Sequence, residues 1–267
     1  MTSTTTQNKL KSILVKLIKA VVVTAFWILV WEAVSLFASR NNELMLLLLP
    51  RPETVFETWL NIAFTEAFVM SVVQSLGRIF SGFLIGLICG IASGLLTHAL
   101  KTADLVLSPM LKMIRAVPVV AVTILFFSLF NSEKLPVCIV ALMVTPLIWQ
   151  TVHDGLRSSD KELCEMAEVF KLSAVKTFVY IKLPSLLPSL LTATVNALGL
   201  AWKSGIAAEV ICEPNVGLGT ILMQGKGMVD FSTVYAVTLT VVILSLIIEV
   251  LLKFLCRVFL EKGRANS

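Results

Sequence analysis

Six long apolar stretches most constrain what this chain can fold into. They run approximately over residues 17–37, 72–96, 117–130, 135–152, 186–208 and 232–252. An α-helix needs about 20 mostly apolar residues to cross a bilayer. An apolar content of 57%, a charged content of 15% and a mean hydropathy of +0.91 agree with that origin and exclude a water-soluble enzyme. The sequence therefore predicts an all-α, polytopic membrane protein with about six transmembrane helices.

The third and the first apolar stretches differ from an ordinary membrane span. The third is short for a crossing unless its helix includes 111–116, and only residues 131–134 separate it from the fourth, which predicts a tight helical hairpin. The first stretch follows a Lys-rich segment, as the core of a signal peptide does. Its apolar core is longer than the roughly 7 to 15 residues of a signal peptide and no small-residue cleavage site follows, so we expect an uncleaved first helix.

The basic residues predict the orientation. Sixteen of the 22 Lys and Arg residues lie in the termini or in alternate loops that share one side, and only four lie on the other side. Because cytoplasmic loops carry the excess of Lys and Arg, we expect both termini in the cytoplasm. The expected organisation is an N-terminal tail over 1–16, a membrane domain over 17–252 with a cytoplasmic loop at 153–185, and a basic tail over 253–267.

The 153–185 loop carries helical pattern outside the apolar stretches. Ser159 and Glu162 have the spacing of a capping box, which predicts a helix start. Ser173 can cap a second short helix, which Pro184 is expected to end. The first helix has one apolar face, because four residues recur at steps of three and four: Leu163, Met166, Ala167 and Phe170. The loop is thus expected to form a helix-turn-helix knob.

The amino-acid sequence of this loop resembles a known sequence motif. Glu165-Met166-Ala167, then Lys171, then Ile181-Lys182-Leu183-Pro184 resemble the EAA motif of ABC importer permeases, with Met166 in place of an Ala and Lys171 in place of a Gly. If that turn is left-handed, Lys there costs about 1 kcal/mol. The resemblance implies a type I ABC importer permease fold with coupling helices that contact a cytoplasmic ATPase through Glu165, Met166, Ala167, Phe170, Lys171, Ile181, Leu183 and Pro184.

Other segments resemble the nitrate, sulfonate and taurine subgroup of these permeases. They include 75–79, 201–203 followed by Glu209, and 217–219, and the resemblance covers most of the chain from Leu49 to Ala236. It implies an inner-membrane protein that works as two permease copies, expected to be a homodimer, with two ATPase subunits and an extracytoplasmic substrate-binding protein. No nucleic-acid partner is expected, because the basic residues do not form one patch.

Four residues are candidates for the substrate pathway. Lys203 is the leading candidate, because exposing a charged side chain of an apolar stretch to lipid costs free energy, and the side chain should therefore face a cavity, a partner or another helix. A neighbouring helix's carbonyls, Glu32 or Glu249 could instead hold it. Trp202 can be a packing aromatic and Glu209 can mark the outer end of its span. Six residues separate Lys203 from Glu209, which places them on different helix faces.

Arg78 is the fourth pathway candidate and lies near the start of a stretch, where snorkelling to the membrane interface is the favoured interpretation. In the same stretch, a glycine stands at every fourth position, which permits close helix approach. Packing inside one subunit is favoured over a dimer interface for this stripe, which consists of Gly82, Gly86, Gly90 and Gly94.

Several function classes can be compared on the sequence alone. No phosphate-binding loop of the Gly-x-x-x-x-Gly-Lys-Ser/Thr type is present, so we expect a non-catalytic subunit with ATP hydrolysis in a separate partner. With only His98 and His153 and no Cys-x-x-Cys spacing, no metal or cofactor is expected. The subgroup implies a small anion such as a sulfonate, taurine or nitrate as substrate; a thiamine-precursor pyrimidine or other small heterocycle is the alternative. An ion-coupled secondary transporter is the alternative of a different class, and an intramembrane enzyme lacks the clustered groups it needs.

Overall fold

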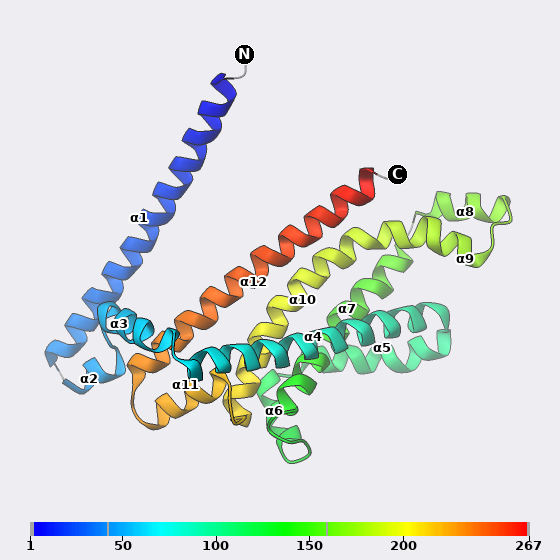
Figure 1. Ribbon diagram of the computed structural model, residues 1–267. Helices are drawn as coiled ribbons and strands as arrows, with labels where there is room; N and C mark the ends of the chain where they lie inside the picture. Colours follow the sequence, from blue (N-terminus) through cyan, green and yellow to red (C-terminus); the bar gives the residue numbers. More distant parts are fainter. Residues whose placement is uncertain (1–2, 42, 159, 266–267) are drawn as a thin grey trace. The chain divides into compact units, whose positions relative to one another are not determined.

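The computed structural model describes residues 3–41, 43–158 and 160–265, and every regular element in them is helical. The chain divides into two units, which are described separately. The first comprises Met1–Phe64 and Gln224–Val237, and the second Thr65–Met223 and Thr238–Ser267. Figure 1 shows the helices in chain order. They are α1 (Ser3–Asn41), α2 (Glu43–Leu48), α3 (Pro52–Ala63), α4 (Glu66–Ala99), α5 (Lys101–Ala116), α6 (Val119–Phe127), α7 (Leu135–Arg157), α8 (Lys161–Val169), α9 (Ala174–Thr177), the π-helical turn η1 (Phe178–Lys182), α10 (Leu183–Cys212), α11 (Leu218–Gly227) and α12 (Phe231–Ala265).

Within these described residues, five helices are long and apolar enough to span a membrane. They lie over Val21–Arg40, Glu66–Ala99, Leu135–Arg157, Ala174–Cys212 and Phe231–Val258, which matches five of the six predicted stretches. Helix α1 begins at Ser3 and α12 continues to Ala265. The segments expected as terminal tails are therefore largely helical.

The third predicted span is not one straight helix. Helices α5 and α6 meet at a bend of 101°, and α6 with nine residues is about 14 Å long, too short for a hydrocarbon core of about 30 Å. The cause is Pro118, which restricts the preceding residue to extended backbone: Val117 has φ −79° and ψ 133°. The condition for a straight third crossing is therefore not met, and α5 and α6 can count only together, as one bent span.

The second unit is organised around α4 and α7, which pack through the glycine stripe. A Cβ atom added at Gly82 would lie 2.7 Å from the Cβ of Val140, and one at Gly94 would lie 2.6 Å from the Cβ of Val152. The interpretation that the stripe packs within one subunit is confirmed. The pairing also advances equally on both helices, so α4 and α7 run parallel at close range.

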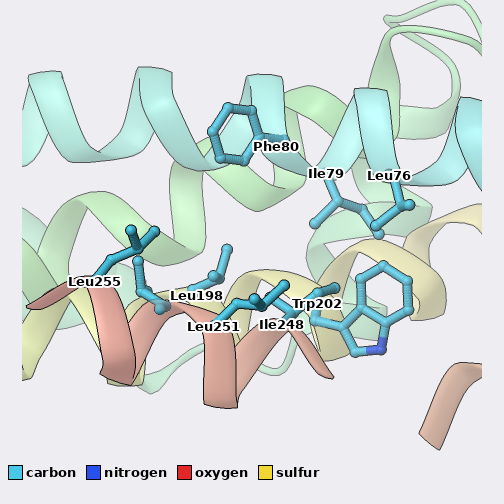
Figure 2. Close-up of a pocket in the computed structure, with 9 residues that line it drawn as sticks. Leu76, Ile79, Phe80, Leu198, Trp202, Ile248, Leu251 and Leu255 are labelled. Atoms are coloured by element: carbon cyan, nitrogen blue, oxygen red, sulfur yellow. The ribbon is translucent and has the colours of Figure 1, made fainter. Parts of the chain in front are cut away.

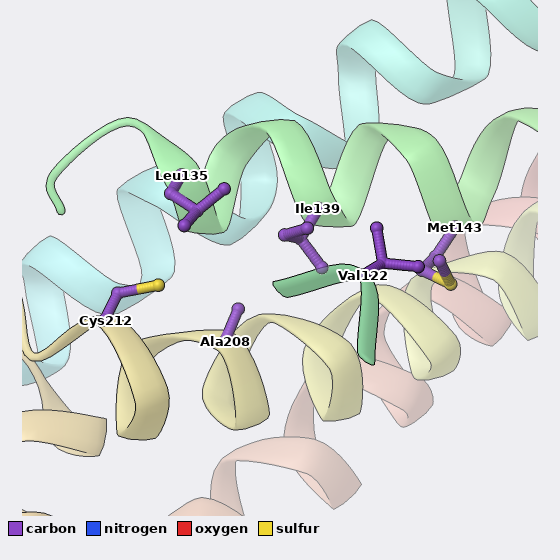
Figure 3. Packing of buried hydrophobic residues seen from close by; sticks show 6 residues of the cluster. All are labelled: Val122, Leu135, Ile139, Met143, Ala208 and Cys212. Atoms are coloured by element: carbon purple, nitrogen blue, oxygen red, sulfur yellow. The ribbon is translucent and has the colours of Figure 1, made fainter. Parts of the chain in front are cut away.

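Because α4 and α7 run parallel, the bent pair of helices α5 and α6 must carry the chain back from the end of α4 to the start of α7. Helix α7 begins beside the early part of α4, so the chain from Leu100 to Lys134 must return over the length of α4. Helices α5 and α6 together make this return, and α6 packs into a buried apolar cluster with α7 and α10 (Figure 3). The cluster comprises Val122, Leu135, Ile139, Met143, Ala208 and Cys212. The break itself is not covered by this chain, because Val117 and Pro118 are both exposed.

From Thr238 onward, helix α12 belongs to the second unit and lies along α10. The Trp202 indole donates to the Val241 carbonyl at 3.0 Å, and the Cys256 Sγ lies 4.0 Å from the Leu191 carbonyl oxygen, so the two helices run antiparallel. Between them and α4 lies a wholly apolar groove (Figure 2). Trp202 lines it from α10, and Ile79 and Leu251 line it from α4 and α12.

In the first unit, two side chains of α1 form hydrogen bonds with the segment that follows α2. Trp31 donates its indole N–H to the Pro50 carbonyl at 3.1 Å, and Ser35 donates to the Leu49 carbonyl at 2.8 Å. The Trp31 ring also lies 5.6 Å from the ring of Tyr235. These contacts set the entry into α3, whose first residue is Pro52, a favoured position for proline.

Candidate functional sites

The first candidate site is the knob, which we define as residues 160–182 with helices α8, α9 and η1. Helix α8 starts at Lys161, one residue later than the predicted capping box implies, with Asp160 as its N-cap. The Asp160 side chain accepts hydrogen bonds from the backbone N–H groups of Glu162 at 2.9 Å and Leu163 at 3.5 Å. Aspartate is a strong N-cap. The expected cap, Ser159, lies outside the described residues.

The turn after α8 is left-handed at Lys171, with φ 51°. The Leu172 N–H donates to the Ala167 carbonyl and the Lys171 N–H donates to the Glu168 carbonyl, both at 2.9 Å. This pair of bonds is the Schellman motif, in which glycine is preferred because it has no Cβ. The condition under which Lys171 was expected to cost about 1 kcal/mol is therefore met.

The second short helix also begins as predicted, because Ser173 Oγ accepts the Lys176 N–H at 3.4 Å. The prediction that Pro184 ends it is wrong. The chain continues from Ala174 to Cys212 as one long helix, and the Leu183 N–H bonds to the Phe178 carbonyl five residues back. This wider turn comes directly before Pro184 and rearranges the bonds there, and proline is tolerated in the first turn of the α-helix that follows.

The knob presents apolar side chains that its own chain leaves uncovered. Phe170 is 72% exposed, and Val169, Val175 and Tyr180 are exposed to a similar degree, whereas Ala167 is buried and anchors α8. Of the other residues predicted to contact an ATPase, Ile181 is half-buried and the rest are exposed: Glu165, Met166, Lys171, Leu183 and Pro184. A contiguous exposed apolar patch is typical of an interaction surface.

One polar contact joins the knob to α4, and two others join α5 to α7 at the end of α7 that precedes the knob. The Lys182 Nζ lies 3.0 Å from the His98 Nε2 on α4. Arg157 on α7 donates to Asp104 on α5 at 2.7 Å, and the Nε2 of His153 lies 3.1 Å from the same carboxylate. The sequence pattern gave no sign of these pairs, because their partners lie 49 to 84 residues apart.

The second candidate site is a buried ionic cluster at the opposite end of α10, about 39 Å from the start of that helix at 1.5 Å per residue. Arg78 on α4 donates from one guanidinium nitrogen to Glu209 on α10 at 3.0 Å and to the Val216 carbonyl at 2.8 Å. Its other nitrogen bonds to Glu133, which precedes α7. Arg78 is 9% exposed and Glu209 is fully buried. The snorkelling interpretation of Arg78 is wrong, because the guanidinium has three acceptors inside the protein.

Glu209 and Ser75 bind the first backbone N–H groups of α11, directly after the loop from α10. The Glu209 carboxylate accepts the Ser75 hydroxyl at 2.6 Å and the Gly219 N–H at 3.3 Å, and the Ser75 oxygen in turn accepts the Leu218 N–H at 2.9 Å. A Cβ at Gly219 would lie 2.4 Å from the Cβ of Glu209. Only glycine permits this approach.

Glu133 closes the cluster from the link between α6 and α7. Burial raises its pKa, but the Asn215 N–H, which donates to it at 2.8 Å, and the charge of Arg78 outweigh that effect. The net pKa of Glu133 is lowered, so the carboxylate is held ionised. Neither Glu133 nor Ser75 was a candidate; the Ser75 spacing of three residues from Arg78, one helical turn, was the available signal.

The structure divides the four pathway candidates into three buried residues and one exposed residue. Arg78 and Glu209 pair with each other, and Trp202 is buried with its indole bonded to α12, which supports its packing interpretation. Lys203 is the exposed one of the four and lies within electrostatic range of Glu249. Lys203 is exposed whereas Glu209 is buried, which agrees with the different helix faces that their spacing predicts.

The fold and both sites define the class: a helical, multi-span membrane subunit with a helix-turn-helix knob in the loop before its fifth predicted span. A family model for the binding-protein-dependent transport system inner membrane component matches residues 82–259. The chain belongs to this family. It is an ABC importer permease subunit of the inner membrane. In this family the permease is non-catalytic, a separate subunit hydrolyses ATP, and a substrate-binding protein is a further partner. An ion-coupled transporter and an intramembrane enzyme are thereby replaced as interpretations.

Curated relatives point to one subgroup. A putative aliphatic sulfonates transport permease of Escherichia coli is 29% identical over 87% of this chain and 87% of its own length. Its namesake in Bacillus subtilis is 29% identical over 70% and 68%. A bicarbonate transport system permease of Synechocystis is 32% identical over 55% and 53%. These matches support the sulfonate and nitrate subgroup.

Solved structures support the fold. An inward-facing MetNI methionine ABC transporter matches with a TM-score of 0.61 at 18% identity, covering 72% of this chain and 95% of that one. An amino acid ABC transporter matches with a TM-score of 0.63 at 18% identity, covering 73% and 95%.

Proposed function

We propose that this permease subunit receives the ATPase stroke through the knob and passes a small anion along a pathway to which Lys203 contributes. The observation that carries the coupling role is the exposed apolar surface around Phe170, at the position of the EAA-like sequence. A surface helix that exposes Val169 and Phe170 needs a partner to bury them. The ATPase that the family requires is the partner we assign.

Glu165→Lys tests the coupling role. Co-expression with the cognate ATPase should yield a complex with the unchanged chain and no stable complex with the variant, because Glu165 is exposed on α8 and its charge is reversed at the interface. Glu57→Lys is the matched control, with the same charge change at an exposed position on α3, outside the knob, and it should leave the complex intact. An intact complex and normal transport in Glu165→Lys would end the coupling proposal.

The anion assignment rests on two supports. Lys203 is an exposed cation within a span-forming helix, and a charge at such a site faces a cavity or a partner more favourably than lipid. The relatives are named for sulfonates and bicarbonate, which are anions. A pyrimidine or another small heterocycle is the second candidate, because Lys203 can also donate a hydrogen bond to a neutral ring.

Lys203→Gln tests the pathway role, with Lys203→Arg as the variant that keeps the charge. We expect the transport KM for the anion to rise at least tenfold in Lys203→Gln and to change little in Lys203→Arg. Unchanged KM and rate in both would remove Lys203 from the pathway. Transport of a neutral pyrimidine with unchanged KM in Lys203→Gln would favour the second candidate.

The working assembly is proposed to contain two copies of this chain, with both termini on the cytoplasmic side together with the knob. The charge asymmetry supports this orientation, as does the antiparallel packing of α10 and α12, which returns the chain towards the knob end. Reporter fusions at each terminus test the orientation. The mass of the purified complex with its ATPase tests the copy number.

A further inference from the structure

The helical connection between the knob and α10 contains a point where it can bend. Helix α9, the turn η1 and α10 continue as one long helix from Ala174 to Cys212. Within that helix η1 is π-helical, because the Leu183 N–H bonds to the Phe178 carbonyl five residues back. A π-helical turn interrupts the regular ladder of backbone hydrogen bonds, and helices bend at such interruptions. A displacement of α9 can therefore bend the chain at η1 without moving α10.

A side-chain hydrogen bond joins this point to α4. Lys182 is the last residue of η1, and its Nζ lies 3.0 Å from the Nε2 of His98, in the last turn of α4. An ammonium group has three N–H donors and no acceptor, so Lys182 donates and His98 accepts. Both residues are half-buried. The bond holds the end of η1 against a second membrane helix at the place where its own helix can bend.

Helices α4 and α10 are also joined near their other ends. Arg78 on α4 donates to Glu209 on α10 at 3.0 Å, and Arg78 lies about 30 Å from His98 along α4 at 1.5 Å per residue. Between these two points the glycine stripe packs α4 closely against α7. Two antiparallel helices are thus joined at both ends, one end at the knob and the other at the loop over 213–217.

We propose that Lys182 and His98 are positioning residues for transport, which hold η1 against α4 so that a displacement of the knob moves α4 and α10 together. The far end of this helix pair holds the loop over 213–217, because Arg78 donates to the Val216 carbonyl at 2.8 Å. The stroke therefore reaches that loop as a movement of two helices. This inference rests on the proposed coupling role of the knob.

Hydrogen–deuterium exchange of the complex with the cognate ATPase, with and without a non-hydrolysable ATP analogue, tests the proposal. In the unchanged complex the analogue should alter amide exchange both in the knob and over 213–217. His98→Leu removes the acceptor and lies outside the knob, so the ATPase should stay bound and the knob should still respond. The response over 213–217 should fall about fivefold or more, the size of a typical coupling between two sites.

Conservative and paired variants separate positioning from a general loss of structure. His98→Gln supplies an amide oxygen that can accept from Lys182 and should keep the response over 213–217. Lys182→Met removes the same bond from the other side, so its combination with His98→Leu should lose no more than either variant alone. Lys101→Met is the control, because it makes the same change at an exposed position on α5, and it should respond as the unchanged complex does.

Failure of this inference and failure of the coupling role give different results. A response over 213–217 that is absent from the unchanged complex, survives in His98→Leu, is not recovered in His98→Gln or is lost equally in Lys101→Met would overturn the inference and leave the coupling role of the knob intact. No response in the knob of the unchanged complex would overturn both. A knob response equal to that of the unchanged complex establishes that each variant is folded and holds the ATPase.

Discussion

The ionic cluster and the knob lie at opposite ends of α10 and satisfy their side chains in opposite ways. In the cluster, the charges of Arg78 and Glu209 are buried and find partners within the chain. In the knob, Phe170 and Val169 are apolar and exposed. The difference predicts that the cluster stabilises this chain by itself, whereas the knob surface, under the proposed coupling role, is covered only when the ATPase binds. Substitutions in the cluster should therefore change stability, and those on the knob surface should change assembly.

The largest expected effect on stability is that of Arg78→Met. It leaves Glu209 buried without its cation, and breaking a buried ion pair from one side costs about 3–5 kcal/mol. We expect the thermal midpoint of the detergent-solubilised protein to fall sharply, with poor yield. Adding Glu209→Leu should recover part of the loss, because no buried charge then lacks a partner. A single variant as stable as the unchanged chain would contradict the role of the cluster.

Gly219→Ala should cost about 1–3 kcal/mol through overpacking. The added Cβ would lie 2.4 Å from the Cβ of Glu209 and 2.5 Å from the backbone nitrogen of Val210, and backbone cannot move aside cheaply. Thermal unfolding measures the loss. Gly227→Ala is the matched control on the same helix, because nothing lies within 4 Å of its added Cβ. Equal midpoints for the two variants would mean that the loop does not need this close approach.

Lys171→Gly should stabilise the knob, whereas the two substitutions above destabilise the chain. Removal of the Cβ from a left-handed residue relieves about 1 kcal/mol at φ 51°, so amide exchange at Leu172 should slow. The control is Lys176→Gly, which puts glycine inside α9 and should speed exchange there. Faster exchange in Lys171→Gly would show that the lysine contributes more through its side chain than its backbone strain costs.

The two regions also differ in how far the sequence predicts them. The knob follows from local signals: the capping residue Ser173 and the spacing of Met166, Ala167 and Phe170 are contained in a short segment. The ionic cluster joins residues up to 143 positions apart, and its charged pair, Arg78 and Glu209, comes from different helices 131 positions apart. Helical periodicity specifies the face of one helix and not the residue that meets it. Both residues were candidates, but their pairing could not be predicted.

The fold shows the same division between local and tertiary information. Five predicted stretches became span-length helices because hydropathy alone defines their length. The sequence did not predict the bend at Val117, and it wrongly predicted that the helix would end at Pro184, although a proline is involved at both places. One proline follows extended backbone and the other follows a π-helical turn. That choice depends on packing around each proline and not on its identity.

The smallest expected effect concerns pH at the cluster. The pKa of Glu133 is lowered in the folded protein, with burial opposing and the Asn215 N–H and Arg78 causing the net shift. A carboxyl whose folded pKa lies below its unfolded value of about 4.3 adds stability that is fully present above that value. The contribution is lost as pH falls through the folded pKa.

Thermal midpoints between pH 7 and pH 3 should therefore decline more steeply in the unchanged chain than in Glu133→Gln. Glu57→Gln on α3 provides a control with the same chemical change away from the cluster, and it should follow the unchanged chain. Parallel curves for the unchanged chain and Glu133→Gln would separate Glu133 from the cluster and leave Arg78 and Glu209 as its stabilising pair.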